Sequence, residues 1–594
     1  MLPPPPPAES APDSTGSLTT LIDSFLLQQG QLNAVEQFSQ WHDRAAPTPA
    51  AHPYRQLIPL HAPRPGEQYA FEVDLDRCSG CKGCVTACHA LNGLDEDETW
   101  REVGLLVGEG RAPDPHSVSG HGPCAHAPPN AIAPARPLQP IQQTVTTACH
   151  HCLEPACLLG CPVLAYDKDP GTGIVRHLDD QCIGCSYCLM MCPYEVPKYS
   201  AKRGIVRKCD LCHGRLAAQE APACVQACPS AAIRITLVET AGWRSELAAL
   251  ADDGHPANAQ TSRPSGSPTS QRRSAAEHAA ADPPPRAWLA DSPDPLLTLP
   301  TTRYVSARPG HDLLAADHGQ PRPAPSHWPL VLMLVFTQCG AGALVAALQL
   351  GSPQIAASSL ALVCAGLGAS VFHLGQPRKA WRIWLGWRTS WLSREAVALN
   401  AFAATGLAAL ALVWNRHDWG WPISSAAAPA GLIWALGALA TVMVWTQTMV
   451  YAKTGRTFWR VGLTLPRFLG TNLLAGGAVA FWLRSAPAIA VALVVIALLK
   501  VGTELSVLKH ADSDADQWTA LRRTAVLQGG PLRGLLALRL LLIGTGGLLV
   551  FAVAVGSADQ AWAGVGLLAG LLGELAERLL FFTSVAPDKM PGLP

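Results

Sequence analysis

The chain has 594 residues with 44 basic and 44 acidic side chains, so its formal net charge is zero and no nucleic-acid partner is indicated. Apolar residues make up 49% of the chain and charged residues 15%, against about 25% charged residues in average soluble domains. The shortage of charge falls mainly after residue 328. This distribution excludes a soluble fold for the whole chain and predicts a soluble domain fused to a membrane domain.

The first fifty residues predict a disordered start followed by a helical arm. Residues 1–15 are Pro-rich, and such sequences do not form a packed core. Apolar side chains recur with helical spacing over residues 17–43. A stripe of this kind indicates packing more often than chemistry, and it also suits docking against a partner subunit.

Sixteen of the nineteen cysteines fall into four tetrads. The first and third tetrads have C-x2-C-x2-C-x3-C spacing, which is typical of ligands of [4Fe–4S] clusters. Because one such cluster takes four thiolates, the chain is expected to hold four [4Fe–4S] clusters as cofactors. The tetrads are Cys78, Cys81, Cys84 and Cys88; Cys149, Cys152, Cys157 and Cys161; Cys182, Cys185, Cys188 and Cys192; and Cys209, Cys212, Cys224 and Cys228.

A disulfide framework and a set of zinc ribbons are the two structural alternatives. Disulfide frameworks suit small secreted domains, and the chain opens with MLPPPPPAES rather than a secretory signal. Zinc ribbons use two short C-x2-C pairs rather than a C-x2-C-x2-C-x3-C-P run. The cysteine spacing therefore disfavours both alternatives.

Short apolar runs alternate with turns between the tetrads, which predicts a duplicated, ferredoxin-like α+β domain over residues 51–240. In two-cluster ferredoxins the fourth cysteine of each run binds the other cluster. By this rule tetrads one and four share two clusters, and tetrads two and three share the other two. The expected ligand sets are Cys78, Cys81, Cys84 and Cys228; Cys88, Cys209, Cys212 and Cys224; Cys149, Cys152, Cys157 and Cys192; and Cys161, Cys182, Cys185 and Cys188.

Two segments lie outside this scheme. Residues 104–148 predict a long loop or insertion, and residues 241–327 predict a linker rich in Pro, Ser and Ala. Within the linker, residues 297–305 look ordered and are expected to pack back on the cluster domain. A metal site in the insertion would have to use Cys124, His116, His121 and His126, which show no regular ligand spacing.

A run of basic residues flanks tetrads three and four. These charges would raise the reduction potentials of nearby clusters, dock a partner, or form an ordinary solvated face. The residues are Lys198, Lys202, Arg203, Arg207, Lys208 and Arg215.

Residues 328–585 predict an all-α membrane bundle of eight helices, followed by a tail over residues 586–594. Each apolar stretch is near the ~20 residues that span a bilayer, and only a helix satisfies its backbone there. The fifth stretch is short and Gly-rich, so it carries the weakest signal. The stretches lie near 328–350, 355–374, 394–414, 429–451, 466–483, 486–508, 535–556 and 561–582.

Loop charges predict the orientation of the bundle. Arg and Lys gather in the loops after the second, fourth and sixth stretches, while the other loops carry almost none. Basic loops stay in the cytoplasm, so both termini and the cluster domain are expected on the cytoplasmic side of the inner membrane. An aromatic belt on that side would contain Trp381, Trp384, Trp387 and Trp391.

Ionisable side chains in these helices are candidate functional groups. His373, at the end of the second stretch, and Glu395, at the start of the third, are expected to take the protons of a quinol. A snorkelling, solvated His373 is the alternative. Lys500–Glu504 and Glu574–Arg578 are spaced four apart and predict self-neutralising pairs on one helix face.

A membrane haem with two histidine ligands needs two histidines that face each other. His417 and His510 lie in predicted loops, which leaves only His373. No haem is therefore expected.

Several phrases resemble a known pair of subunits. CHHCLEPACLLGCP, CIGCSYCLMMCPYEVPKY and RKCDLC…CVQACP resemble the four-cluster subunit of DMSO-reductase-family molybdoenzymes. HWPLVLMLVFTQ, HLGQP, SWLSREA and GELAERLLFF resemble the eight-helix anchor of the same enzymes. The resemblance covers roughly residues 69–240 and 327–585, so the chain is similar to the two subunits fused.

The resemblance implies a function. A separate catalytic subunit would carry the molybdopterin cofactor, and the anchor would exchange electrons with menaquinol or ubiquinol in the lipid. The quinol-binding histidine of the family would fall on His373, and each tetrad cysteine would carry over as a cluster ligand. The chain would then serve anaerobic respiration as electron-transfer subunit and anchor.

Other functions stay open at this point. A sulfite dehydrogenase of the same family would send electrons into the quinone pool, whereas a sulfoxide reductase would draw them out. A redox-driven ion transporter is an alternative from another class, and a polysulfide-reductase-type anchor is a weaker one. The sequence shows no nucleotide-binding motif and no domain large enough for a molybdopterin, so the substrate pocket is expected in a partner.

Overall fold

The computed structural model describes residues 56–111, 138–254, 286–289, 292–306, 313–418, 429–511 and 518–592. The predicted N-terminal arm and the segment that contains Cys124 lie outside these residues. Leu57–Pro594 form one unit through their contacts. Within that unit we refer to residues 57–315 as the cluster half and to residues 324–592 as the membrane half.

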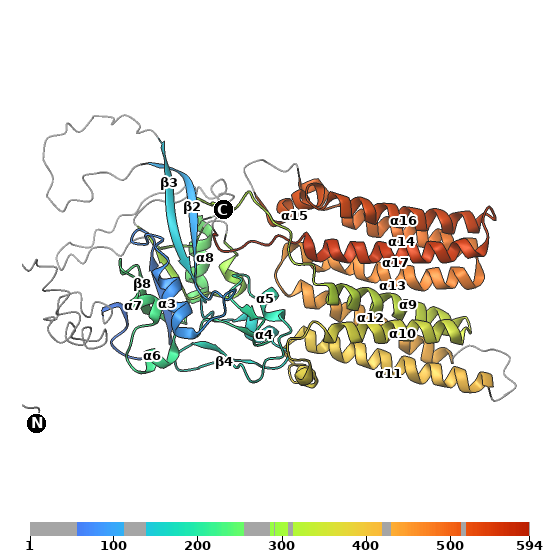
Figure 1. The fold of residues 1–594 in the computed structure, drawn as a ribbon, viewed down its shortest axis with the longest axis horizontal. Coiled ribbons are helices and arrows are strands. Elements are labelled where there is room, and N and C mark those ends of the chain that lie inside the picture. Colours follow the sequence, from blue (N-terminus) through green and yellow to red (C-terminus); the bar gives the residue numbers. More distant parts are fainter. Residues whose placement is uncertain are drawn as a thin grey trace, which may run out of the picture. The chain divides into compact units, whose positions relative to one another are not determined.

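The cluster half consists of short strands and helices joined by the cysteine loops (Figure 1). Its strands are β1 (Glu67–Asp74), β2 (Glu102–Arg111), β3 (Leu138–Thr147), β4 (Tyr166–Lys168), β5 (Val175–His177), β6 (Lys198–Ser200), β7 (Ile205–Arg207), β8 (Ile233–Glu239), β9 (Arg286–Ala287), β10 (Arg303–Val305) and β11 (Leu314–Ala315). Its helices are α3 (Gly83–Asn92), α4 (Ala156–Gly160), α5 (Tyr187–Met191), α6 (His213–Ala217), α7 (Ala223–Gln226), α8 (Trp243–Gly254) and the 3-10 helix η2 (Pro295–Leu297).

The largest sheet has the strand order β8-β1-β10-β9. β1 pairs antiparallel with β8, from Glu67↔Glu239 to Val73↔Ile233, and parallel with β10. β10 lies within residues 297–305, so the expectation that this part packs back on the cluster domain is confirmed. β9 also comes from the predicted linker and pairs antiparallel with β10. Together the two strands cover the second edge of β1, whose backbone groups would otherwise stay unpaired.

The segment predicted as a long loop begins and ends as a hairpin. β2 and β3 pair antiparallel over ten positions, from Glu102↔Thr147 to Arg111↔Leu138. Leu106 in β2 and Val145 in β3 are both buried. The sequence prediction overlooked this hairpin, because neither strand shows a regular alternation of apolar and polar residues.

Eight long helices lie side by side in the described part of the membrane half (Figure 1). Six of them are long and apolar enough to cross a membrane. They are α9 (Trp328–Gln349), α10 (Pro353–Val371), α11 (Trp391–Asp418), α12 (Ala430–Ala452), α13 (Val461–Arg484), α14 (Pro487–Leu505), α16 (Arg533–Ala554) and α17 (Gln560–Thr583), with the shorter α15 (Ala520–Gly529) and the 3-10 helices η3 (Pro377–Trp384), η4 (Thr457–Trp459) and η5 (Leu508–His510) between them.

α13 and α17 are the two long helices that fall short of that apolarity. α17 carries Glu574, Glu577 and Arg578, which are all buried inside the bundle. α13 starts five residues before its predicted start at Pro466, which lies inside the helix. A proline near a helix start removes a single backbone hydrogen bond, so the helix extends through it.

The HLGQP phrase docks on the loop of the third tetrad. The N–H of Gly375 donates to the carbonyl of Gly184 at 3.3 Å, and the N–H of Gln376 donates to that of Ile183 at 3.0 Å. A Cβ atom on Gly375 would lie 2.2 Å from the carbonyl oxygen of Gly204. Glycine is therefore required where these two backbones meet.

The polypeptide after α17 returns to the cluster half. The carbonyl of Gly592 accepts a hydrogen bond from the N–H of Leu105 in β2 at 3.1 Å. Lys589 forms an ion pair with Asp317, close to β11. The C-terminal segment therefore contacts the same hairpin that precedes the second tetrad.

Candidate functional site

The tetrad cysteines meet in four sets, each drawn from two runs. Three cavities are each lined by one set, and the fourth set gathers in a single buried cluster around Cys188. These are the same sets that the ferredoxin rule predicts. We number them site 1 (Cys78, Cys81, Cys84, Cys228), site 2 (Cys88, Cys209, Cys212, Cys224), site 3 (Cys149, Cys152, Cys157, Cys192) and site 4 (Cys161, Cys182, Cys185, Cys188).

All four tetrads share one backbone turn that the sequence did not reveal. The residue before the second cysteine has a left-handed conformation in each: Gly80 (φ 71°), His151 (φ 44°), Gly184 (φ 67°) and Leu211 (φ 59°). The turn aims backbone N–H groups at sulfur: Gly184 donates to Cys182 Sγ at 3.4 Å and Leu211 to Cys209 Sγ at 3.5 Å. At His151 and Leu211 the conformation is strained, and such strain gathers at functional sites.

Burial sets the chemistry of these thiols. It raises the pKa of Cys88 to about 12 and that of Cys192 to about 11. Iron binds the thiolate form of cysteine, which burial disfavours because it removes water from the charge. Cationic iron would therefore have to stabilise the thiolates in place of water. In the described residues no three His, Cys, Asp or Glu side chains converge on a single metal ion. Each cysteine of a [4Fe–4S] cluster binds a different iron, so sulfurs spread around a cavity fit that group.

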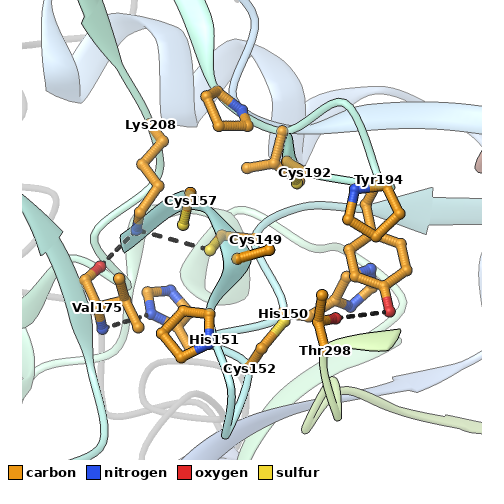
Figure 2. Close-up of a pocket in the computed structure, with 15 residues that line it drawn as sticks. Cys149, His150, His151, Cys152, Cys157, Val175, Cys192, Tyr194, Lys208 and Thr298 are labelled. Carbon is orange, nitrogen blue, oxygen red and sulfur yellow. Dashed lines mark hydrogen bonds between the residues drawn. The ribbon is translucent and has the colours of Figure 1, made fainter. Parts of the chain in front are cut away.

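Lys208 lies beside the cysteines of site 3 (Figure 2), and it also contacts the backbone of Cys209 from site 2. Its side chain is buried, and its Nζ donates to the carbonyls of Val175 and, at 2.8 Å, of Cys209. The same atom lies 3.6 Å from Cys149 Sγ. Burial lowers the pKa of Lys208, but the surrounding thiolates raise it, and the net direction is upward. The possibility of an ordinary solvated face is therefore wrong for this residue.

The other basic residues of that run differ. Arg207 is also buried and pairs with Glu98 at 2.9 Å, whereas Lys202 and Arg203 are exposed. Only part of the basic run therefore faces solvent.

Arg101 is a second buried cation, and no sequence pattern indicated it. Its NH1 donates to Thr146 Oγ1 at 3.1 Å. Burial lowers its pKa, but Cys224 and Cys84, from sites 2 and 1, raise it and decide the direction. Each of these two cations thus lies where two neighbouring cysteine sites meet.

Shared elements place the four sites in a series. α3 carries Cys84 of site 1 and Cys88 of site 2. Sites 2 and 3 are joined through Lys208. α4 carries Cys157 of site 3 and ends directly before Cys161 of site 4. Site 1 is the least buried, because its Cys81 is exposed.

A cavity of about 500 Å³ adjoins site 4. Cys185, His373 and Glu395 all line it, so the structure brings the two predicted quinol residues together beside a cysteine site. Pockets for small organic ligands typically measure ~300–1,000 Å³ and are largely apolar, as this one is. Trp381 and Trp384 from the predicted aromatic belt line the same cavity.

The geometry at His373 fixes its tautomer. Its Nε2 lies 2.9 Å from the backbone carbonyl of Cys185. A carbonyl oxygen only accepts, so Nε2 carries the hydrogen and Nδ1 is left as an acceptor. Burial lowers the pKa of His373, which keeps the ring neutral near pH 7. The solvated, snorkelling alternative does not describe a ring held in this way.

Glu395 and its neighbours form the polar wall of the cavity. Glu395 is only 2% exposed, and the side chain of Gln447 lies beside its carboxyl group. Tyr187 and Tyr451 also line the cavity, and the hydroxyl of Tyr187 donates to the carbonyl of Val450 at 2.7 Å. Sequence reasoning missed Tyr187 because it lies within the third tetrad.

His327, directly before α9, is a further residue that sequence reasoning missed. Its ring centroid lies 5.9 Å from that of His373. Burial, together with His373 and Arg456, lowers the pKa of His327. The premise that only one histidine lies near the bundle is therefore wrong, and the absence of haem stays a prediction.

A network of buried charges joins three helices of the bundle. Lys500 Nζ lies 3.0 Å from Glu574, 3.5 Å from Glu504 and 3.7 Å from Glu577. Arg539 pairs with Glu504 and Glu574 at 3.1 Å each. The predicted Lys500–Glu504 pair is present, but it is one contact of a larger network.

Arg578 extends this network toward the cavity. It pairs with Glu577 at 3.1 Å rather than with Glu574, four residues away. Its NH2 donates to Gln338 Oε1 at 3.0 Å, and Gln338 donates to Gln447 at 2.8 Å. Hydrogen bonds thus link the buried charges to the neighbour of Glu395.

Four buried cysteine sets followed by a bundle of apolar helices define the class of the protein: an iron–sulfur electron-transfer domain with a membrane anchor. The family model described as "4Fe-4S dicluster domain" matches residues 142–237. The model described as "DMSO reductase anchor subunit (DmsC)" matches residues 324–583.

Characterised relatives share the cluster half. The B subunit of the anaerobic dimethyl sulfoxide reductase of Haemophilus influenzae is 35% identical over 167 residues, which cover 28% of this chain and 73% of the relative. The B subunit of the corresponding Escherichia coli reductase is 34% identical over 166 residues, or 28% of this chain and 72% of the relative. The Escherichia coli hydrogenase-2 operon protein HybA is 34% identical over 193 residues, or 30% of this chain and 52% of the relative.

The protein belongs to the family of the iron–sulfur subunits of dimethyl sulfoxide reductases, and here that subunit is fused to the anchor subunit. It is a membrane protein that transfers electrons and anchors a molybdoenzyme complex.

Proposed function

We propose that the sixteen tetrad cysteines hold one [4Fe–4S] cluster at each of sites 1 to 4. The four sites lie in series, and each is lined by four thiols, most of them buried. When bound, such clusters supply one-electron transfer. The chain's own contribution is to fix the order of the sites and to hold Arg101 and Lys208 at their junctions, where a positive charge favours the reduced state.

The cavity beside site 4 is proposed to bind menaquinol or ubiquinol. His373 Nδ1 would accept a hydrogen bond from one quinol hydroxyl, and Glu395 would accept from the other. The two groups would then take the two protons that leave with the two electrons. The cavity volume and its aromatic walls suit a flat ring.

One observation carries this proposal: the hydrogen bond between His373 and the carbonyl of Cys185. Cys185 belongs to site 4, and His373 lines the cavity. A single residue pair therefore joins the last thiol site to the quinol cavity without an intervening element.

We propose the cytoplasmic side of the inner membrane as the place of the cluster half, because the basic loops of the bundle lie on that side of the helices. The absence of haem stays a prediction.

The partner at the other end would be a molybdopterin-containing catalytic subunit. Site 1 is the natural contact, because it holds the exposed Cys81. The relatives named dimethyl sulfoxide reductase favour a reductive direction, from quinol to an S-oxide. A sulfite-oxidising complex would use the same route in reverse.

The ion-translocating alternative has less support. Glu504 lies one residue before the end of α14, and Arg539 lies in the second turn of α16. The described network therefore gathers near the ends of the helices that face the cluster half. A route across the membrane would need ionisable groups near the opposite ends as well.

Replacement of Cys185 by Ser tests the cluster assignment. The variant is expected to lose or convert one of four [4Fe–4S] signals in electron paramagnetic resonance, with a matching fall in bound iron. Cys339→Ser is the control, because Cys339 is buried in α9 outside every tetrad. Four unchanged signals in Cys185→Ser would contradict the proposal.

Replacement of His373 by Ala tests the quinol site. Reduction of the clusters by added quinol is expected to stop, while dithionite still reduces all of them. His318→Ala is the control, since His318 bonds to the carbonyl of Ala315 away from the quinol cavity. Full quinol activity in the His373 variant would remove the basis for this site.

A further inference from the structure

A second cavity, of about 470 Å³, lies where the cluster half meets the membrane half. More charged side chains line this cavity than line the quinol cavity, and both halves supply them. Its lining includes Glu195 and Lys198 from the cluster half, and Arg456 and Lys589 from the membrane half. These charged groups suit the cavity to exchange protons with solvent.

His327 lies at the junction of the two cavities. It lines the charged cavity, and its ring is 5.9 Å from His373, which lines the quinol cavity. Met190 lines both cavities, so they adjoin at this point. The other ring in contact with His327 is the apolar Phe582, at 5.7 Å.

The backbone at His327 leaves the imidazole available. The residue takes a left-handed conformation (φ 46°) at the start of α9, and its side chain makes no capping hydrogen bond to the helix. A non-glycine residue in this conformation is strained, and strain of this kind gathers at functional positions. The ring contacts the ring of His373 and does not cap its own helix.

We propose that His327 relays protons between the quinol cavity and the charged cavity. The inference rests on the proposed quinol site. During quinol oxidation two O–H bonds break, two electrons pass to two oxidised [4Fe–4S] clusters, and two protons are released. These protons leave the quinol cavity one at a time through the imidazole, which accepts at one nitrogen and donates from the other. Quinone reduction runs the same path inward.

The experiment uses the full chain with its clusters and a short-chain ubiquinol, with menadiol as second donor. Single-turnover cluster reduction is followed by absorbance, and proton release by a pH indicator. His327→Gln is expected to slow both signals on the order of 10²-fold, as loss of a positioned proton-transfer group does. Added imidazole is expected to restore the rate, while the affinity for a quinone analogue stays unchanged.

His318→Gln is the matched control. His318 lines the same charged cavity, but it bonds to Ala315 at 2.7 Å and packs on Trp518, with ring centroids 6.3 Å apart. Its variant is expected to behave as the wild type.

Two results would overturn the relay. One is an unchanged rate in His327→Gln; the other is a slow rate with weakened analogue binding and no rescue by imidazole, which would mark a structural role. Failure of the relay is distinguishable from failure of the quinol site. If His373→Ala stops reduction and His327→Gln does not, only the relay fails; if neither variant slows reduction, the quinol site itself fails.

Discussion

Lys208 in the cluster half and Lys500 in the bundle are both buried ammonium groups, but their surroundings differ. Lys500 lies within 4 Å of three carboxylates. The Nζ of Lys208 instead contacts two backbone carbonyls and the thiol of Cys149. The bundle thus contains its own counter-charges, whereas the cluster half is built for negative charge that arrives with iron and sulfide.

The comparison explains how the two halves depend on their surroundings. A buried charge without a counter-charge is strongly unfavourable. The thiol sites of the cluster half should therefore be stable only when loaded. The bundle should fold through its helices and ion pairs whether or not iron is present.

Removal of iron should give the largest effect. Anaerobic chelation is expected to unfold residues 56–254, because cluster binding and folding are coupled, while the helices of the bundle persist. Limited proteolysis would detect cleavage in the cluster half, and circular dichroism would report the retained helix. If the cluster half stays protease-resistant without iron, the proposed difference between an iron-dependent cluster half and an iron-independent bundle is wrong.

The Lys500→Met substitution should have the second-largest effect. It leaves three buried carboxylates with fewer cations, and breaking a buried ion pair from one side costs about 3–5 kcal/mol. The thermal stability of the bundle should fall while the cluster spectra stay unchanged. Lys509→Met is the control, since Lys509 is exposed in η5 and should have little effect.

Lys208→Met should change the reduction potentials of the neighbouring clusters and have little effect on the fold. A unit charge a few Å from a cluster contributes on the order of 2–4 kcal/mol at an effective dielectric constant of ~20. Its loss should lower the potentials of the clusters at sites 2 and 3 by roughly 50 mV or more. A redox titration would measure this shift, and the exposed Lys202→Met should show none.

A solvent-exposed ion pair should give the smallest effect. Arg244 and Glu154 lie 2.9 Å apart, and each side chain is more than half exposed. Arg244→Ala is expected to change stability by less than about 1 kcal/mol, and less still in high salt. A larger loss would show that burial does not decide what these charges contribute.

Cysteine spacing predicted more of the cluster half than any other feature. The rule that the fourth cysteine crosses to the neighbouring cluster follows from local spacing, so the four sets can be read without a structure. The roles of those cysteines as iron ligands stay predictions. Lys208 could not be assigned from its neighbours in sequence, because its burial depends on β5 and on the second tetrad, both distant in sequence.

In the membrane half, too, some features follow from the sequence and others do not. Helix number follows from length and apolarity, and six of the eight helices meet that criterion. The pairing of Arg578 with Glu577 instead of Glu574 does not follow from spacing, because Lys500 and Arg539 from other helices already surround Glu574. His327 was missed because its neighbour His373 is 46 positions away and is reached only after α9 and α10 pack.

The return of the C-terminal segment to β2 has a consequence for assembly. The bond between Gly592 and Leu105 joins the segment after the last helix to the cluster half, and the pair between Lys589 and Asp317 joins it to the residues directly after β11. Docking of the two halves is thereby intramolecular, with an effective concentration that two separate polypeptides diluted in a bilayer would not reach. Every copy of the protein contains one cluster half and one membrane half. Neither half can therefore be present in excess and compete for partners.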